Sequence, residues 1–124
     1  MNDFQPKITL VKIPVSNIEK SVAYYRDVLG LPESFSALEY GWAQLEVGSL
    51  PFCLYEAGKG GGGGTPGTCD AVHFAVSDAA ASYEALAVRG ANIPSGLETS
   101  ADGMRFFDIH DPDGNLIKVV QRKA

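Results

Sequence analysis

Residues 11–30 decide the fold, and they read VKIPVSNIEKSVAYYRDVLG. The segment Ile8–Val15, which overlaps the start of this stretch, is rich in β-branched residues and predicts a strand. Ser16 and Glu19 then match a capping box, so we predict Ser16 as the N-cap of a helix. Gly30 ends this helix, because glycine adopts positive φ freely. The apolar positions recur on one helix face, and they are Ile18, Val22, Tyr25 and Leu29.

Three more strands and a glycine-rich segment complete the first half of the chain. We predict the strands at Glu33–Leu38, Trp42–Val47 and Phe52–Glu56, with glycines marking the turns between them. Residues 58–68 read GKGGGGGTPGT, which predicts a mobile linker or loop. We favour this over a phosphate-binding loop, because the order Gly-x-x-x-x-Gly-Lys-[Ser/Thr] is absent.

The same order of elements restarts after the glycine-rich segment. Val15-Ser16-Asn17 and Val76-Ser77-Asp78 lie 61 residues apart, and the flanking residues match at the same offset. Ser77-Asp78 caps a second helix, and residues 111–114 (DPDG) form a strong hairpin turn. The predicted strands are Ala71–Val76, Asn92–Ile93, Arg105–His110 and Asn115–Gln121, and the apolar helix positions are Ala79, Tyr83, Leu86 and Ala87.

Each half therefore has the order βαβββ, which predicts an α+β fold built from two tandem modules. A length of 124 residues suits a single domain over residues 1–124. Within it we place module one at about 7–57, the glycine-rich linker at 58–68 and module two at about 70–122.

Composition and charge argue against several classes of partner. The net charge is −5 and the basic residues are dispersed, so we expect no nucleic acid. No apolar run approaches the roughly 20 residues of a membrane span, so we expect no membrane. The first seven residues lack the apolar segment of a signal peptide, which predicts a cytoplasmic protein. Cys53 and Cys69 form neither a CxxC pair nor a zinc spacing, and we favour reduced thiols over the alternative of a disulfide between them.

Three segments resemble the vicinal oxygen chelate superfamily, which includes glyoxalase I, extradiol dioxygenases, and fosfomycin- and bleomycin-resistance proteins. They are residues 11–30, residues 72–78 (VHFAVSD) and residues 107–117 (FDIHDPDGNLI). The resemblance implies paired βαβββ modules whose curled mixed sheet surrounds a cavity. It also implies a homodimer, in which a partner module often completes that cavity. In the enzymes of the family, a divalent metal in the cavity chelates two oxygens of the substrate.

The metal-ligand positions of this family hold unsuitable residues in this sequence. The family's ligands are usually His or Glu, and the motifs place the four positions at Leu10, Cys53, Ala71 and Lys118. Two of these side chains are apolar and one is a cation, whereas divalent ions need oxygen, imidazole or thiolate donors. We therefore expect no metal and no other cofactor.

Alternation along the strands separates a cavity face from a core face. Lys12 and His73 are mates at the repeat offset and share the cavity face with Lys118. A partly apolar pocket with a few convergent polar groups is typical of a small-molecule site. We predict that the ligand-binding residues are Lys12, Trp42, Gln44, Cys53, Tyr55, His73 and Lys118. Lys12 and His73 are also the candidates for acid–base catalysis, but we favour a Lys12 ammonium that reaches past the rim into water.

These observations leave three functions open. We favour a metal-free small-molecule binding protein, similar to bleomycin-resistance proteins, that is a homodimer and takes an anionic or carbonyl-bearing ligand. The alternative is an enzyme with a rearranged active site, either a glyoxalase-type lyase or isomerase or a dioxygenase-like enzyme. The third is a structural or regulatory dimer whose cavity is filled by its own side chains.

Overall fold

The computed structural model describes residues 3–122, so residues 1–2 and 123–124 of the predicted domain lie outside the described range. Module one consists of β1 (Val11–Val15), α1 (Ile18–Ala23), the π-helical turn η1 (Tyr24–Val28), β2 (Glu33–Ala37), the 3-10 turn η2 (Leu38–Tyr40), β3 (Trp42–Val47) and β4 (Leu50–Glu56). Module two consists of β5 (Val72–Val76), α2 (Ala79–Val88), β6 (Glu98–Thr99), β7 (Arg105–His110) and β8 (Leu116–Gln121).

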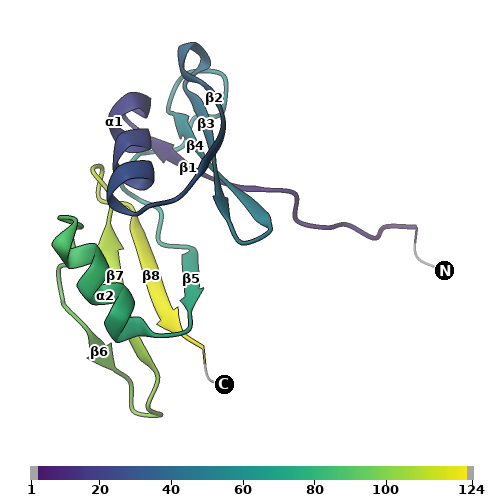
Figure 1. Cartoon of the computed structure of the whole chain (residues 1–124). Coiled ribbons are helices and arrows are strands. Elements are labelled where there is room, and N and C mark those ends of the chain that lie inside the picture. The colour runs from purple at the N-terminus through teal and green to yellow at the C-terminus, as the bar shows by residue number, and fades with distance from the viewer. Residues whose placement is uncertain (1–2, 123–124) are drawn as a thin grey trace.

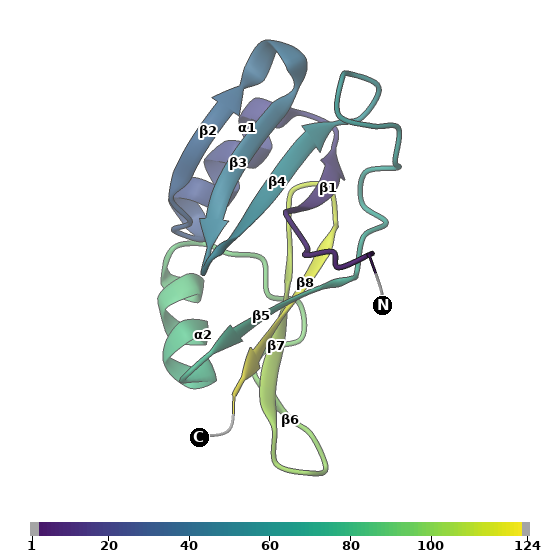
Figure 2. The same cartoon turned by 90° about the vertical axis from the view of Figure 1, so that its right-hand side faces the viewer.

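Each module folds into a four-stranded mixed sheet with its helix on one face (Figure 1). The strand orders are β1-β4-β3-β2 and β5-β8-β7-β6. In each sheet the first strand of the module runs parallel to the last one, and the remaining pairs are antiparallel. The two sheets follow one another along the molecule, as Figure 2 shows from a second direction. This architecture confirms the predicted α+β fold of two tandem βαβββ modules.

The core lies between each sheet and its helix. The four predicted apolar positions of the first helix are all buried, with Tyr25 fully enclosed and Leu29 at most 9% exposed. In the second helix Ala79 is buried, but Ala87 is exposed, because the helix packs through its Tyr83 and Leu86 side chains instead. Within the described part of the chain, no helix is long and apolar enough to cross a membrane.

Two predicted strands differ from the structure by more than two residues. The first begins at Val11 rather than Ile8, because pairing with β4 begins at Val11, and Ile8 is 73% exposed. The strand predicted at Asn92–Ile93 is only an isolated bridge between Asn92 and His110. The edge strand of module two is instead β6, which pairs with the start of β7. Local β-propensity does not show which segment finds a neighbour, so strand edges depend on tertiary pairing.

The N-cap of α1 is Asn17, so the prediction of Ser16 is wrong. The Asn17 side chain accepts a hydrogen bond from the backbone N–H of Lys20 at 3.0 Å. Ser16 instead binds Asp113 in the turn before β8, through its backbone N–H at 3.0 Å and through its hydroxyl. A contact between the modules thus replaces the local cap. In α2 the predicted cap is confirmed, because Asp78 accepts from the first turn of the helix.

Asn115 joins the two modules through buried hydrogen bonds. Its side chain is fully enclosed, and its Nδ2 donates to the backbone oxygen of Pro14 at 2.8 Å and to Asp111 at 2.9 Å. Its Oδ1 accepts from the backbone N–H groups of Gly67 at 2.9 Å and Cys69 at 3.1 Å. One side chain therefore ties β1, the end of the glycine-rich segment and the turn before β8 together.

A row of aromatic rings crosses the same junction. The Tyr25 and Phe52 ring centroids lie 5.5 Å apart, and Phe52 meets Phe74 of module two at the same distance. The Tyr25 hydroxyl donates to the buried Asp111 carboxylate at 2.9 Å. Burial and the neighbouring carboxylate raise the pKa of this tyrosine far above its ordinary value. Tyr25 therefore stays neutral and acts as a donor at the junction.

Glu56 gives the start of α1 a pH-dependent support. Its carboxylate accepts from the backbone N–H of Ile18 at 3.0 Å and pairs with Lys59 at 3.0 Å, and these two contacts lower its pKa. A lowered folded-state pKa means that the ionised carboxylate stabilises the fold, and that this contribution disappears as the pH falls through that pKa. We expect Glu56→Gln to flatten the fall in stability below about pH 4.5, measured by urea unfolding at a series of pH values.

Lys59→Met separates the two contacts of Glu56. Because the Ile18 N–H is the larger cause of the lowered pKa, Lys59→Met should keep most of the wild-type pH dependence. Equal pH dependence of Glu56→Gln and the wild-type protein would contradict the assignment.

Candidate functional site

The predicted site residues form two clusters, one on each sheet. In the strand registers Lys12 lies beside Cys53, and His73 lies beside Lys118. These two pairs occupy equivalent places in the two modules, as the repeat offset predicts. The module-one cluster contains Lys12, Trp42, Gln44, Cys53 and Tyr55, and the module-two cluster contains His73 and Lys118.

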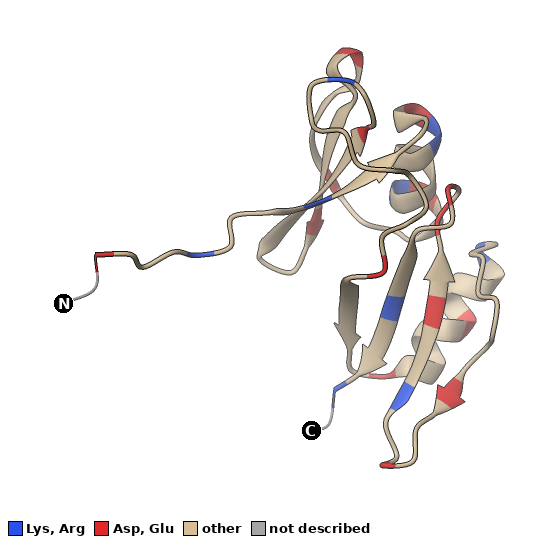
Figure 3. Ribbon diagram, turned by 180° about the vertical axis from the view of Figure 1, so that it is seen from behind, with Lys and Arg blue, Asp and Glu red and all other residues tan. Residues whose placement is uncertain are grey.

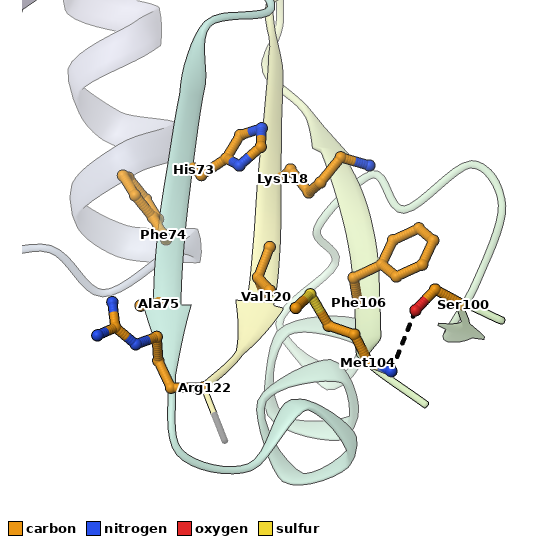
Figure 4. Close-up of a pocket in the computed structure, with 9 residues that line it drawn as sticks. All are labelled: His73, Phe74, Ala75, Ser100, Met104, Phe106, Lys118, Val120 and Arg122. Carbon is orange, nitrogen blue, oxygen red and sulfur yellow. Dashed lines mark hydrogen bonds between the residues drawn. The ribbon is translucent and has the colours of Figure 1, made fainter. Parts of the chain in front are cut away.

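Module two carries an open cavity of about 500 Å³ on the sheet face opposite α2 (Figure 4). Its walls come from β5, β7 and β8, together with the hairpin that leads into β7. Alternation places Phe106 on this face, whereas Phe107 points to the core and packs against Tyr83 with a centroid distance of 5.6 Å. The lining residues are His73, Phe74, Ala75, Ser100, Met104, Phe106, Lys118, Val120 and Arg122.

The charge of Lys118 is held in place within the cavity. Its Nζ lies 2.9 Å from Oδ1 of Asp108 and 4.5 Å from the centre of the Phe106 ring. Figure 3 shows the pair as a blue segment of β8 beside a red segment of β7. An ammonium with one carboxylate partner still has N–H donors for a second acceptor. The cavity thus offers a fixed donor next to an aromatic face.

A small hairpin shapes the mouth of the cavity. The backbone N–H of Met104 donates to the Ser100 hydroxyl at 3.1 Å, and the Ser100 N–H donates to the Met104 carbonyl at 2.8 Å. This arrangement holds the Met104 thioether against the open side of the sheet (Figure 4). Methionine is flexible and polarizable, so it can adapt to ligands of different shape.

The glycine-rich segment covers the module-one cluster. Lys12 Nζ donates to the backbone oxygen of Gly61 at 2.5 Å and lies 4.9 Å from the centre of the Tyr55 ring. The Tyr55 hydroxyl accepts from the backbone N–H of Gly64 at 3.1 Å. The segment does join the modules, but through these two hydrogen bonds it also contacts the module-one sheet.

The other two predicted residues of module one are the buried Cys53 and the half-buried Gln44. Cys53 is fully buried, and burial raises the pKa of its thiol. Gln44 accepts from the indole N–H of Trp42 at 3.4 Å. Cys53 and Cys69 are both free thiols. An open pocket of about 480 Å³ lies next to Trp42, and its lining residues are Phe35, Ala37, Tyr40, Trp42, Gly60 and Gly61.

The residues at the family's metal positions do not fit a divalent ion. Leu10 and Ala71 have no donor atom, and Lys118 presents an ammonium already paired with Asp108. The buried Cys53 thiol has a raised pKa, which disfavours the thiolate that a metal needs. In residues 3–122 no group of three or more His, Cys, Asp and Glu side chains is arranged to hold a metal.

Several cavity residues lie outside the sequence prediction. Ser100 and Met104 belong to a hairpin that no periodic pattern marks, and Arg122 follows the last strand. Val120 and Phe106 can be found by alternation, because Val120 lies two residues from Lys118 and Phe106 lies two residues from Asp108, the partner of Lys118. The side-chain alternation therefore finds the sheet floor of the cavity but not its mouth.

Known proteins with this fold match almost the whole chain. An integron cassette protein from the mobile metagenome of V. Cholerae is 26% identical with a TM-score of 0.73, covering 99% of this chain and 100% of that one. TioX from Micromonospora sp. ML1 is 20% identical with a TM-score of 0.80, covering 95% and 100%. No curated protein matches. A sequence model of the family matches residues 7–119, and the chain therefore belongs to the Glyoxalase/Bleomycin resistance protein/Dioxygenase superfamily.

Proposed function

We propose that this chain is a metal-free small-molecule binding protein whose ligand lies in the module-two cavity. The observation that carries the proposal is the composition of that cavity. Phe106, Met104 and Val120 supply an apolar surface, and Lys118 presents its ammonium among them (Figure 4). Small-molecule sites combine such a surface with a few polar groups that fix orientation.

The polar groups of the cavity favour a ligand with a carboxylate or carbonyl next to an apolar body. Lys118 is anchored by Asp108, so a ligand oxygen can take one of its remaining N–H groups without displacing the ion pair. His73 and Arg122 also line the cavity and add donors. The cavity has more cationic than anionic side chains, which disfavours ligands that are themselves cations.

We also propose a homodimer in which the second copy closes the cavity. The residues before β1 form an arm that extends away from the rest of the chain (Figure 1). Phe4 and Ile8 on this arm are each 73% exposed. Exposed apolar side chains on an extended arm favour packing against a second copy.

A thermal-shift screen of aromatic acids, antibiotics and divalent metals tests the binding function. A ligand at about 100 times its Kd stabilises the native state by about 2.7 kcal/mol, which raises the Tm by several degrees. We expect such shifts with aromatic acids or antibiotics, and mass spectrometry should recover the ligand unchanged. Tight binding of one equivalent of a divalent ion would overturn the metal-free proposal.

The double variant Asp108→Asn/Lys118→Gln should weaken binding of an anionic ligand about tenfold, because one charged hydrogen bond contributes about 1.5 kcal/mol. Removing both charges leaves no unpaired carboxylate, and the pair is partly open to solvent, so its loss should cost only about 1 kcal/mol of stability. Calorimetric titration measures the affinity. The matched control Arg26→Gln/Glu33→Gln removes an ion pair of module one and should bind as the wild-type protein does.

A further inference from the structure

The glycine segment, residues 58–64, contacts the module-one sheet through bare backbone. A Cβ on Gly61 would lie 2.5 Å from Cβ of Tyr55 and 3.1 Å from the indole of Trp42. A Cβ on Gly64 would collide with the Tyr55 hydroxyl. In contrast, a Cβ on Gly63 would meet nothing within 4 Å. Glycine is therefore required at the two points of contact, and not simply for flexibility.

Few contacts hold the glycine segment down. They are two hydrogen bonds, from Lys12 to Gly61 and from Gly64 to Tyr55, and two contacts of Lys59 with Glu56, an ion pair and a backbone hydrogen bond of 3.1 Å. The segment consists of glycines and one lysine, so it buries no apolar side chain of its own. Each glycine also loses more backbone entropy on ordering than any other residue. Lifting the segment therefore costs little free energy compared with unfolding the sheet beneath it.

Lifting the glycine segment would expose the Lys12 ammonium, which has no carboxylate partner in the described part of the chain. Within residues 3–122, Lys12 forms no ion pair, and its partner is the Gly61 carbonyl oxygen. The Tyr55 ring lies under the Lys12 ammonium, and the Trp42 indole lies against Gly61. The aromatic pocket of Phe35 and Tyr40 continues from Trp42. The Lys12 ammonium and the neighbouring aromatic rings would thus form one continuous surface.

We propose that the glycine segment is a lid on a second ligand site, separate from the module-two cavity. The site takes a planar aromatic carboxylate. Its carboxylate replaces the Gly61 carbonyl on Lys12 Nζ, because an anion is a stronger acceptor for an ammonium than a neutral carbonyl. Its ring packs against Trp42 and Tyr55, where offset or edge-to-face contacts add to the area buried. The closed lid lowers the apparent affinity by the fraction of molecules that are open.

Trp42 reports on this site, because it is the only tryptophan of the chain. We propose to titrate trans-cinnamate and its neutral isostere trans-cinnamamide while following the indole N–H resonance of Trp42 by NMR. If the lid is open in about a tenth of the wild-type molecules, Gly61→Ala should bind cinnamate about tenfold more tightly. The free Gly61→Ala protein should also show a shifted indole resonance.

Gly63→Ala is the matched control, because its added methyl has room, and it should bind as the wild-type protein does. Lys12→Met in the Gly61→Ala background should bind cinnamate no better than cinnamamide. Asp108→Asn/Lys118→Gln should leave the Trp42 response unchanged, which separates this site from the module-two cavity. Equal cinnamate affinity in Gly61→Ala and Gly63→Ala, in proteins of native fold by their amide spectra, overturns the lid. If cinnamate shifts the Trp42 indole resonance equally with and without Lys12, the carboxylate site is overturned.

Discussion

Replacing Asn115 with alanine should lower the free energy of unfolding by about 3 kcal/mol, since every buried partner left without a hydrogen bond costs about 1–3 kcal/mol. The substitution removes two donations, to the Pro14 carbonyl and to Asp111, and two acceptances, from Gly67 and Cys69. Water can replace some of these bonds at the edge of the junction, so the cost stays below the sum of four losses. Urea unfolding followed by far-UV circular dichroism measures the change.

The control for Asn115→Ala is Asn92→Ala, the same substitution at an exposed side chain. The Asn92 contacts at the module junction are made by its backbone, which alanine keeps. Asn92→Ala should therefore stay within about 0.5 kcal/mol of the wild-type protein. A similar loss in the two variants would show that Asn115 is not the polar anchor of the junction.

Replacing Phe52 with alanine should have an even larger effect, about 4 kcal/mol, because Phe→Ala in a core removes transfer free energy and leaves a cavity. Phe52 is 1% exposed and stands between Tyr25 of module one and Phe74 of module two. The loss would open the contact through which both modules share one core. Since native domains are stable by only about 5–15 kcal/mol, the variant should be close to unfolding at 37 °C.

Phe35→Ala provides the matched comparison for Phe52→Ala. Phe35 lies on β2 of the same sheet but is 54% exposed, so its truncation should change the unfolding free energy by at most about 0.5 kcal/mol. Differential scanning calorimetry of the two variants measures the contrast. Two separate unfolding transitions in the wild-type protein would contradict a single core that spans the modules.

Much of the fold can be predicted from the sequence, because its elements depend on local patterns. The helix face of Ile18, Val22, Tyr25 and Leu29 is buried as its spacing predicts, and β3 and β7 have the predicted ends. The ends of the outer strands cannot be predicted in this way. Neither the late start of β1 nor the position of β6 follows from propensity, since each depends on which backbone lies alongside.

The sequence by itself determined the two repeated βαβββ modules, through their matching motifs, and which residues share a strand face, because side chains alternate in every strand. That the strands form two separate sheets was decided by tertiary pairing. Only the tertiary structure decided what each face meets. Asn17 rather than Ser16 caps α1, because the Ser16 hydroxyl is hydrogen-bonded to Asp113, a residue 97 positions away. The glycine-rich segment, which reads as a linker, lies on Lys12 and Tyr55 because a backbone without side chains fits there. Such contacts join residues distant in the chain, and no local pattern records them.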